Sequence, residues 1–116
     1  ALKAKMVLLS FWASWNESSI KRNLELLNIY RRYHEKGFEI YQVSLDTDSK
    51  AWQRAVQFDQ LPWINVSSLN GRNSYAARIY NVQNVPTEYL IHRKRGIIAK
   101  NPSKEKLRRE LSIALD

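Results

Sequence analysis

The chain has 116 residues, an apolar fraction of 44% and a formal net charge of +8. These values suit one compact domain over residues 1–116, with a core that needs neither disulfides nor a metal. The sequence contains no cysteine, which excludes a disulfide framework, a Cys-ligated zinc site and a thiol nucleophile. No apolar run approaches the ~18 residues that cross a membrane.

The positive charge is spread along the chain in short groups. These are Lys21-Arg22, Arg31-Arg32, Arg93-Lys94-Arg95 and Arg108-Arg109. Because most of them fall on expected helix faces or turns, the pattern favours solvated surfaces and argues against nucleic-acid binding. Binding of an acidic polymer through the same groups stays open as another hypothesis, and it predicts a strong salt dependence.

The first part of the chain predicts a strand, a helix and a second strand. Residues 6–11 form an apolar run typical of a strand covered on both faces. A helix-start signal at Asn16 and an end signal at Gly37 bracket a predicted amphipathic helix. Its apolar stripe consists of Ile20, Leu24, Leu27 and Tyr30. Residues 38–45 then predict a strand parallel to the first, with a right-handed crossover.

The rest of the chain completes an α/β pattern. It predicts a helix opened by Asp48-Ser49, an extended or short-strand loop at 61–66, a helix over 74–80, a hairpin of 87–92 and 96–100, and a final helix opened by Pro102-Ser103. The inward-facing residues of the first and last of these helices are expected to be Trp52, Ala55, Val56, Leu107, Leu111 and Leu115. We therefore expect a central mixed sheet, flanked by helices, with strand order 38–45, 6–11, 87–92, 96–100.

Two motifs about 70 residues apart carry a family resemblance. Phe11-Trp12-Ala13-Ser14-Trp15 resembles the strand end that leads into C-x-x-C in the thioredoxin superfamily, and Val85-Pro86-Thr87 resembles its cis-proline segment. Residues 37–40, 43–46 and 73–82 resemble the TlpA/ResA-type branch of extracytoplasmic, often membrane-tethered thiol–disulfide oxidoreductases. The resemblance implies a thioredoxin-like fold, truncated at the N-terminal strand because the strand before Lys3 is absent. Strand 38–45 is then expected at a sheet edge.

The residues at the C-x-x-C positions cannot perform the family's chemistry. That chemistry uses a low-pKa thiolate at a helix N-terminus and a second thiol that resolves the mixed disulfide. Asn16 and Ser19 stand in these positions, and neither an amide nor a serine without a base is a nucleophile. Ser10 also replaces the buried acid or amide often found in the family. Asn16 is expected to cap the helix by accepting from Ser18 or Ser19 N–H, or to contact a ligand.

A binding role needs no thiol. In the superfamily, the backbone before the proline pairs with an extended peptide, which is a form of β-augmentation. The resemblance therefore gives the candidate binding residues as Trp15, Asn16, Glu17, Val85 and Pro86. The alternative is that the proline is retained only for the fold. Among the other tryptophans, Trp12 and Trp52 are expected in the core, whereas Trp63 is expected to shape the groove or to be partly buried.

Other polar residues give no metal or cofactor site. His34 and His92 lie on different predicted elements, where they are expected as a helix-end cation and a hairpin residue. Asp46 and Asp48 follow a strand end, a common location of sites in α/β proteins, although Asp48 also fits a helix cap. The glycines are isolated, so no phosphate-binding loop is predicted. We expect no cofactor.

The sequence thus favours a redox-inactive, extracytoplasmic (periplasmic) domain that binds a protein or peptide. A membrane tether through a missing N-terminal segment is expected from the same resemblance. The alternative is a thiol–disulfide oxidoreductase or antioxidant protein of cell redox homeostasis, with cysteines supplied by a partner or a missing segment.

Overall fold

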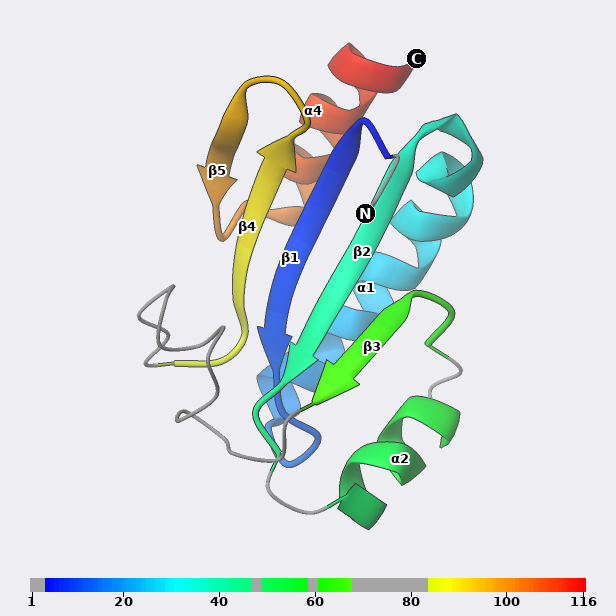
Figure 1. The fold of residues 1–116 in the computed structure, drawn as a ribbon, viewed down its shortest axis with the longest axis vertical. Coiled ribbons are helices and arrows are strands. Elements are labelled where there is room, and N and C mark those ends of the chain that lie inside the picture. The colour runs from blue at the N-terminus through cyan, green and yellow to red at the C-terminus, as the bar shows by residue number, and fades with distance from the viewer. Residues whose placement is uncertain (1–3, 47–48, 59–60, 68–83) are drawn as a thin grey trace.

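A computed structural model describes residues 4–46, 49–58, 61–67 and 84–116. It shows the α/β fold that the sequence predicts, built on a five-stranded mixed sheet of order β3-β2-β1-β4-β5 (Figure 1). The strands are β1 (Met6–Trp12), β2 (Phe38–Ser44), β3 (Ile64–Ser67), β4 (Thr87–His92) and β5 (Gly96–Lys100). The predicted helix over 74–80 and the predicted cap Asp48 lie outside the described residues.

The strand pairing confirms the predicted order of the four expected strands and corrects the predicted edge. β1 pairs with β2 in parallel and with β4 antiparallel, and β4 and β5 form the predicted hairpin. The expectation that strand 38–45 is an edge is wrong, because β3 pairs in parallel along it from Tyr41↔Ile64 to Ser44↔Ser67. The segment expected as an extended loop thus satisfies main-chain groups that an edge leaves unpaired.

Within the described residues, three α-helices flank or adjoin this sheet. They are α1 (Glu17–Tyr33), α2 (Ser49–Phe58) and α4 (Lys104–Leu115), and a short 3-10 helix, η1 (His34–Lys36), extends α1. Gly37 follows η1 with φ of 112°, a left-handed conformation that suits glycine. α1 and α4 lie side by side on one face of the sheet (Figure 1). Ser103 caps α4 as predicted, because its side chain accepts from the N–H of Lys106.

The main core lies between the sheet and the helices α1 and α4. It contains Met6, Leu8 and Trp12 of β1 together with Leu26, Ile29, Leu107 and Leu111 of the helices. A smaller cluster of Phe11, Val43 and Leu45 forms on the other face. The two clusters follow from the alternation of side chains along β1 and β2. Trp52 is half-buried against the main core, as expected for α2.

The apolar stripe predicted for α1 is rotated in the structure. Leu24 is 53% exposed, and Ile20 and Leu27 are only partly buried. The buried face instead carries polar side chains at its start, Ser19 and Asn23, before Leu26, Ile29, Tyr30 and Tyr33. Inward positions held by hydrogen-bonded polar side chains give no signal in an apolar pattern, so the stripe alone misplaces the helix face.

A buried amide network explains the position of Trp63. Its Nε1 donates to Oε1 of Gln42 at 2.6 Å, and Nε2 of Gln42 donates to Oδ1 of Asn23 at 2.6 Å. The network connects the segment before β3 with β2 and α1. Trp63 is only 5% exposed. The expectation that it shapes a groove is therefore wrong, because its indole N–H has its partner inside the core.

Candidate functional site

The structure brings the two sequence motifs to one end of the sheet. Phe11, near the end of β1, pairs with Thr87 at the start of β4. The turn after β1 and the segment before β4 therefore lie at the same end of the molecule, where α1 also begins (Figure 1). The peptide bond between Val85 and Pro86 is cis. This juxtaposition follows from the antiparallel register of β1 and β4.

Asp46 holds the turn that leads from β1 into α1. Its carboxylate accepts from the main-chain N–H of Ser14, with both oxygens at 3.2 Å, and from the Ser14 hydroxyl at 2.5 Å. The hydroxyl of Ser44 donates to the same carboxylate. Asp46 is 2% exposed, so these donors compensate for the loss of its hydration. The acid that follows β2 thus positions the site and does not face solvent.

Asn16 caps α1 as the sequence predicts. Its Oδ1 accepts from the N–H of Ser19 at 2.8 Å, and its backbone is extended, with φ of −103° and ψ of 116°. This bond satisfies one of the main-chain donors that a helix N-terminus leaves free. A neutral amide oxygen therefore interacts with the helix end at the position where the family's first thiol stands.

Ser19 is enclosed at the position of the second thiol. It is 0% exposed, and its Oγ accepts from the N–H of Ala13 at 3.4 Å. A serine hydroxyl without a general base remains protonated and unreactive near neutral pH. With Asn16 used as a cap and Ser19 enclosed, the described geometry contains no nucleophile at either position.

A buried ion pair lies one helical turn beyond Ser19, and sequence analysis missed it. Arg22 of α1 donates through Nη2 to Oε1 of Glu88 in β4 at 2.7 Å, and its Nε lies 3.0 Å from both carboxylate oxygens. Nη2 also donates to the carbonyl of Pro102 at 2.8 Å. Glu88 is 2% exposed. A carboxylate within a predicted strand, 66 positions from its partner, was the available signal.

The ionisation of this pair reflects opposing effects. Burial raises the pKa of the Glu88 carboxyl, and the bonds from Arg22 act against that rise. Burial acts to lower the pKa of Arg22, but the hydrogen bonds and charges of Glu88 and Glu25 together raise that pKa above its ordinary value. Glu88 also bonds to Ser10, the residue directly opposite it on β1. A buried acid is therefore present beside Ser10, supplied by the neighbouring strand.

An apolar hollow opens beside the capped helix end. The Trp15 hollow has a volume of about 300 Å³ and is lined by Ser14, Trp15, Glu17, Ile20, Lys21 and Leu24. Trp15 is 66% exposed. Val85 and Pro86 are half-buried and do not line this hollow. Val85 instead packs against the cluster around Phe11. The hollow therefore lies along the exposed face of α1. The predicted apolar stripe placed Leu24 on the buried face of this helix, so the sequence did not indicate a hollow here.

The two histidines lie where the sequence predicts, His34 directly after α1 and His92 at the end of β4 in the hairpin. The ring of His34 stacks on Tyr30, with centroids 4.6 Å apart. His92 Nδ1 accepts from the N–H groups of Lys94 and Arg95 in the hairpin turn. Local burial, followed by the charge of Arg95, lowers the pKa of His92. Within the described ranges, no group of three or more His, Cys, Asp or Glu side chains is placed to hold a metal.

Comparisons with known proteins identify the family. A family described as thioredoxin-like matches residues 4–98. The thiol-disulfide oxidoreductase ResA of Oceanobacillus iheyensis is 31% identical over 91 residues, which cover 78% of this chain and 45% of that protein. Nucleoredoxin of Xenopus laevis is 29% identical over 110 residues, covering 92% of this chain and 26% of that protein. The chain thus spans less than half the length of these two relatives.

A solved structure of a related protein shows that the similarity extends to the fold. A thiol-disulfide oxidoreductase from Bacteroides fragilis is 33% identical and superposes with a TM-score of 0.86, covering 96% of this chain and 82% of that one. In the part of the chain that the structure describes, no helix is long and apolar enough to cross a membrane. The match over residues 4–98, the mixed sheet and the position of the two motifs lead to one conclusion: the chain belongs to the thioredoxin-like family, with thiol-disulfide oxidoreductases among its relatives.

Proposed function

We propose that this chain is a redox-inactive thioredoxin-like domain that binds a protein or peptide through the Trp15 hollow. The observation that carries the proposal is the exposure of Trp15 and Leu24, which both line one apolar hollow. Large apolar side chains exposed next to a concave surface are typical of interaction sites, and tryptophan is prominent among residues that dominate binding energy.

The chemistry of the site supports binding over electron transfer. Dithiol exchange requires a thiolate and a resolving thiol, and the chain contains no cysteine. Asn16 instead stabilises the helix end, and the Asp46 contacts fix the turn that carries Trp15. A rigid turn loses little conformational freedom on binding, which favours affinity for an extended ligand.

The proposed ligand is a peptide segment with an apolar anchor side chain. Trp15 and Leu24 would contact the anchor, and Glu17 with Lys21 would face polar groups at the rim of the hollow. Asn16 lies between Trp15 and Glu17 in the chain and would contribute the remaining polar surface of its side chain. Val85 and Pro86 are proposed to bind the main chain of a longer peptide at the start of β4, by β-augmentation.

Peptide display gives a direct test with a closely matched control. We expect a random peptide library selected on the wild-type domain to yield aromatic or aliphatic motifs. The double variant Trp15→Ser/Leu24→Ser should bind the selected peptides at least about tenfold more weakly. This factor corresponds to a loss of roughly 1.4 kcal/mol or more of binding free energy from the anchor side chain. Ile97→Ser/Ile113→Ser removes two apolar side chains of similar exposure, 55% and 72%, away from the hollow.

The control variant should retain wild-type affinity. Equal losses in the two double variants, or no enrichment on the wild-type domain, would contradict the proposal. The same wild-type sample should reduce insulin disulfides no faster than a buffer blank with dithiothreitol. Turnover above the blank would instead support an oxidoreductase that borrows thiols from another molecule.

We also propose an extracytoplasmic location. The support is the resemblance of residues 37–40, 43–46 and 73–82 to the TlpA/ResA-type branch, whose members act outside the cytoplasm. Fractionation of the source cells, followed by immunodetection of this domain, tests the proposal. Recovery with the cytoplasmic fraction would contradict it.

A further inference from the structure

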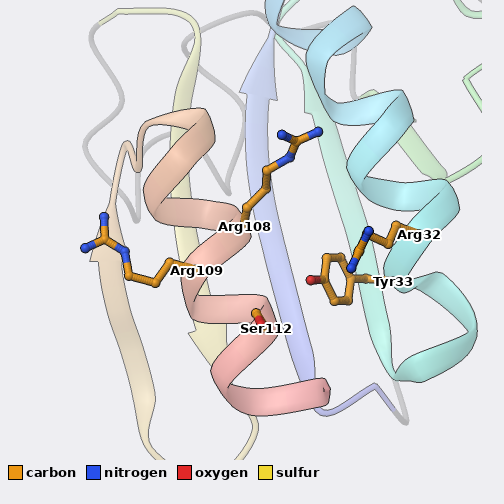
Figure 2. Close-up of a pocket in the computed structure, with 5 residues that line it drawn as sticks. All are labelled: Arg32, Tyr33, Arg108, Arg109 and Ser112. Carbon is orange, nitrogen blue, oxygen red and sulfur yellow. The ribbon is translucent and has the colours of Figure 1, made fainter.

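Arginines that lie far apart in the sequence, Arg32 on the one hand and Arg108 with Arg109 on the other, meet at one surface hollow. This arginine hollow lies between α1 and α4 and has a volume of about 380 Å³ (Figure 2). It is lined by Arg32, Tyr33, Arg108, Arg109 and Ser112. It is separate from the Trp15 hollow, with which it shares no residue. Folding thus concentrates charge that appears dispersed in the sequence.

Two of the guanidinium groups face the hollow from opposite walls. The Arg32 guanidinium lies over the ring of Tyr33, 5.5 Å from its centroid, in a cation–π contact that holds it on the α1 side. Arg108 extends from α4 into the gap between the helices, whereas the guanidinium of Arg109 points toward β5 (Figure 2). Arg32 and Arg108 are therefore the two arginines positioned to bind one ligand together.

These charges have no carboxylate partner within the described part of the chain. No ion pair in this part of the chain includes Arg32, Arg108 or Arg109, although the same surface already holds one carboxylate. Asp116 accepts from Lys36 at 2.6 Å and from the hydroxyl of Tyr33 at 3.1 Å. Hydrogen bonds from Lys36 first, then from Ser112 and Tyr33, lower the pKa of Asp116 to about 2. The surface thus stabilises a carboxylate while two guanidinium groups stay available.

The location favours separate carboxylates over a compact dianion such as phosphate. Arg32 and Tyr33 belong to the last turn of α1, which lacks the free main-chain N–H groups with which a helix N-terminus binds a compact anion. The two guanidinium groups stand on different helices, which suits charges borne by different side chains of one ligand. We infer that the arginine hollow binds an acidic peptide segment whose Asp or Glu side chains pair with Arg32 and Arg108.

Calorimetric titration tests this inference with a defined probe. The probe is a ten-residue peptide of Asp and Glu alternating with Gly and Ser, and its amide counterpart contains Asn and Gln. We expect the acidic peptide alone to bind, more weakly as salt rises. Arg32→Ser/Arg108→Ser should weaken binding at least about tenfold, because it removes two charge-assisted contacts.

A control variant that loses the same number of charges distinguishes the effect of the hollow on binding from the effect of the net charge. Arg31→Ser/Arg95→Ser also removes two exposed arginines, one of them in the same turn of α1, and should weaken binding less than about threefold. Trp15→Ser/Leu24→Ser should leave the affinity unchanged, so the inference and the proposed function can fail independently. Thermal melts of each variant check that the fold is retained.

Several results would overturn the inference. Equal losses in the two arginine variants would show that net charge alone attracts the peptide. Inorganic phosphate, phosphatidylglycerol vesicles and single-stranded DNA serve as competing ligands in parallel titrations. Absence of peptide binding, or tighter binding of any of these three that is lost in Arg32→Ser/Arg108→Ser, would assign the hollow to another class of anion.

Discussion

At the residue scale, Asn16 shows how a catalytic position can be converted into a structural one. The N-terminus of a helix carries partial positive charge and free N–H groups, which stabilise a thiolate in redox-active proteins. In this chain the Oδ1 of Asn16 takes that place, 2.8 Å from the N–H of Ser19. The substitution therefore removes the nucleophile and still stabilises the helix.

Removal of this cap should destabilise the domain measurably. Asn16→Ala is expected to lower the free energy of unfolding by about 1 kcal/mol, because the N–H of Ser19 loses its acceptor. Urea denaturation followed by circular dichroism measures the change. Asn16→Asp should retain most of the stability, and Asn28→Ala, at an exposed position within α1, should change it by less than about 0.5 kcal/mol. Equal stabilities of Asn16→Ala and the wild type would refute the capping role.

At the scale of elements, the Arg22–Glu88 pair joins three parts of the fold. Arg22 belongs to α1 and Glu88 to β4, and the contact of Arg22 with the carbonyl of Pro102 reaches the start of α4. Asn101 completes the arrangement, since its Oδ1 accepts from the N–H of Glu88 at 2.7 Å. The pair thus fixes how α1 and α4 sit on the sheet.

A double-mutant cycle should reveal this coupling. Arg22→Met and Glu88→Gln are each expected to cost about 3 to 5 kcal/mol of unfolding free energy, because each leaves a buried polar or charged partner without its counterpart. The double variant should lose less unfolding free energy than the two single variants lose in sum, by about 0.5 to 3 kcal/mol. Guanidinium denaturation of the four proteins measures the coupling energy. Additive effects would show that the two side chains do not interact in solution.

The sequence predicted elements better than it predicted contacts between them. The β1 strand, the hairpin and α4 were predicted because local apolar periodicity and turn residues define them. The pairing of β3 with β2 was missed, since four residues carry little periodic signal and the partner is distant in the chain. Arg22–Glu88 was missed for the same reason: it depends on how a helix sits against a strand.

At the scale of the whole molecule, sequence analysis located the candidate site and misjudged its shape. The two motifs indicated the correct end of the sheet, because the resemblance fixes the order of strands. The hollow itself required the rotation of α1, which turns Leu24 outward and Ser19 and Asn23 inward. Polar side chains that satisfy one another in a core cannot be distinguished from surface residues by type alone.

The scaffold should accept the missing thiols. The chain has no other cysteine, so Asn16→Cys/Ser19→Cys introduces a single pair. We expect insulin reduction at least about tenfold above the wild type, with the thiol at position 16 titrating below the usual ~8.5, because the helix end favours the anion. Iodoacetamide labelling of Asn16→Cys as a function of pH measures this pKa, with Asn28→Cys as a control of ordinary pKa. Equal pKa values in these two variants would contradict the expectation.

The burial of the tryptophans has a practical consequence for spectroscopy. Trp12 and Trp63 are enclosed, Trp52 is half-buried, and Trp15 is largely surrounded by water. Indole emission shifts to the red in water, and a soluble quencher such as acrylamide reaches exposed rings first. The red, quenchable part of the intrinsic fluorescence therefore reports on the surroundings of Trp15. Binding of a molecule that covers this ring would therefore be detected as a blue shift of the intrinsic emission, without any attached dye.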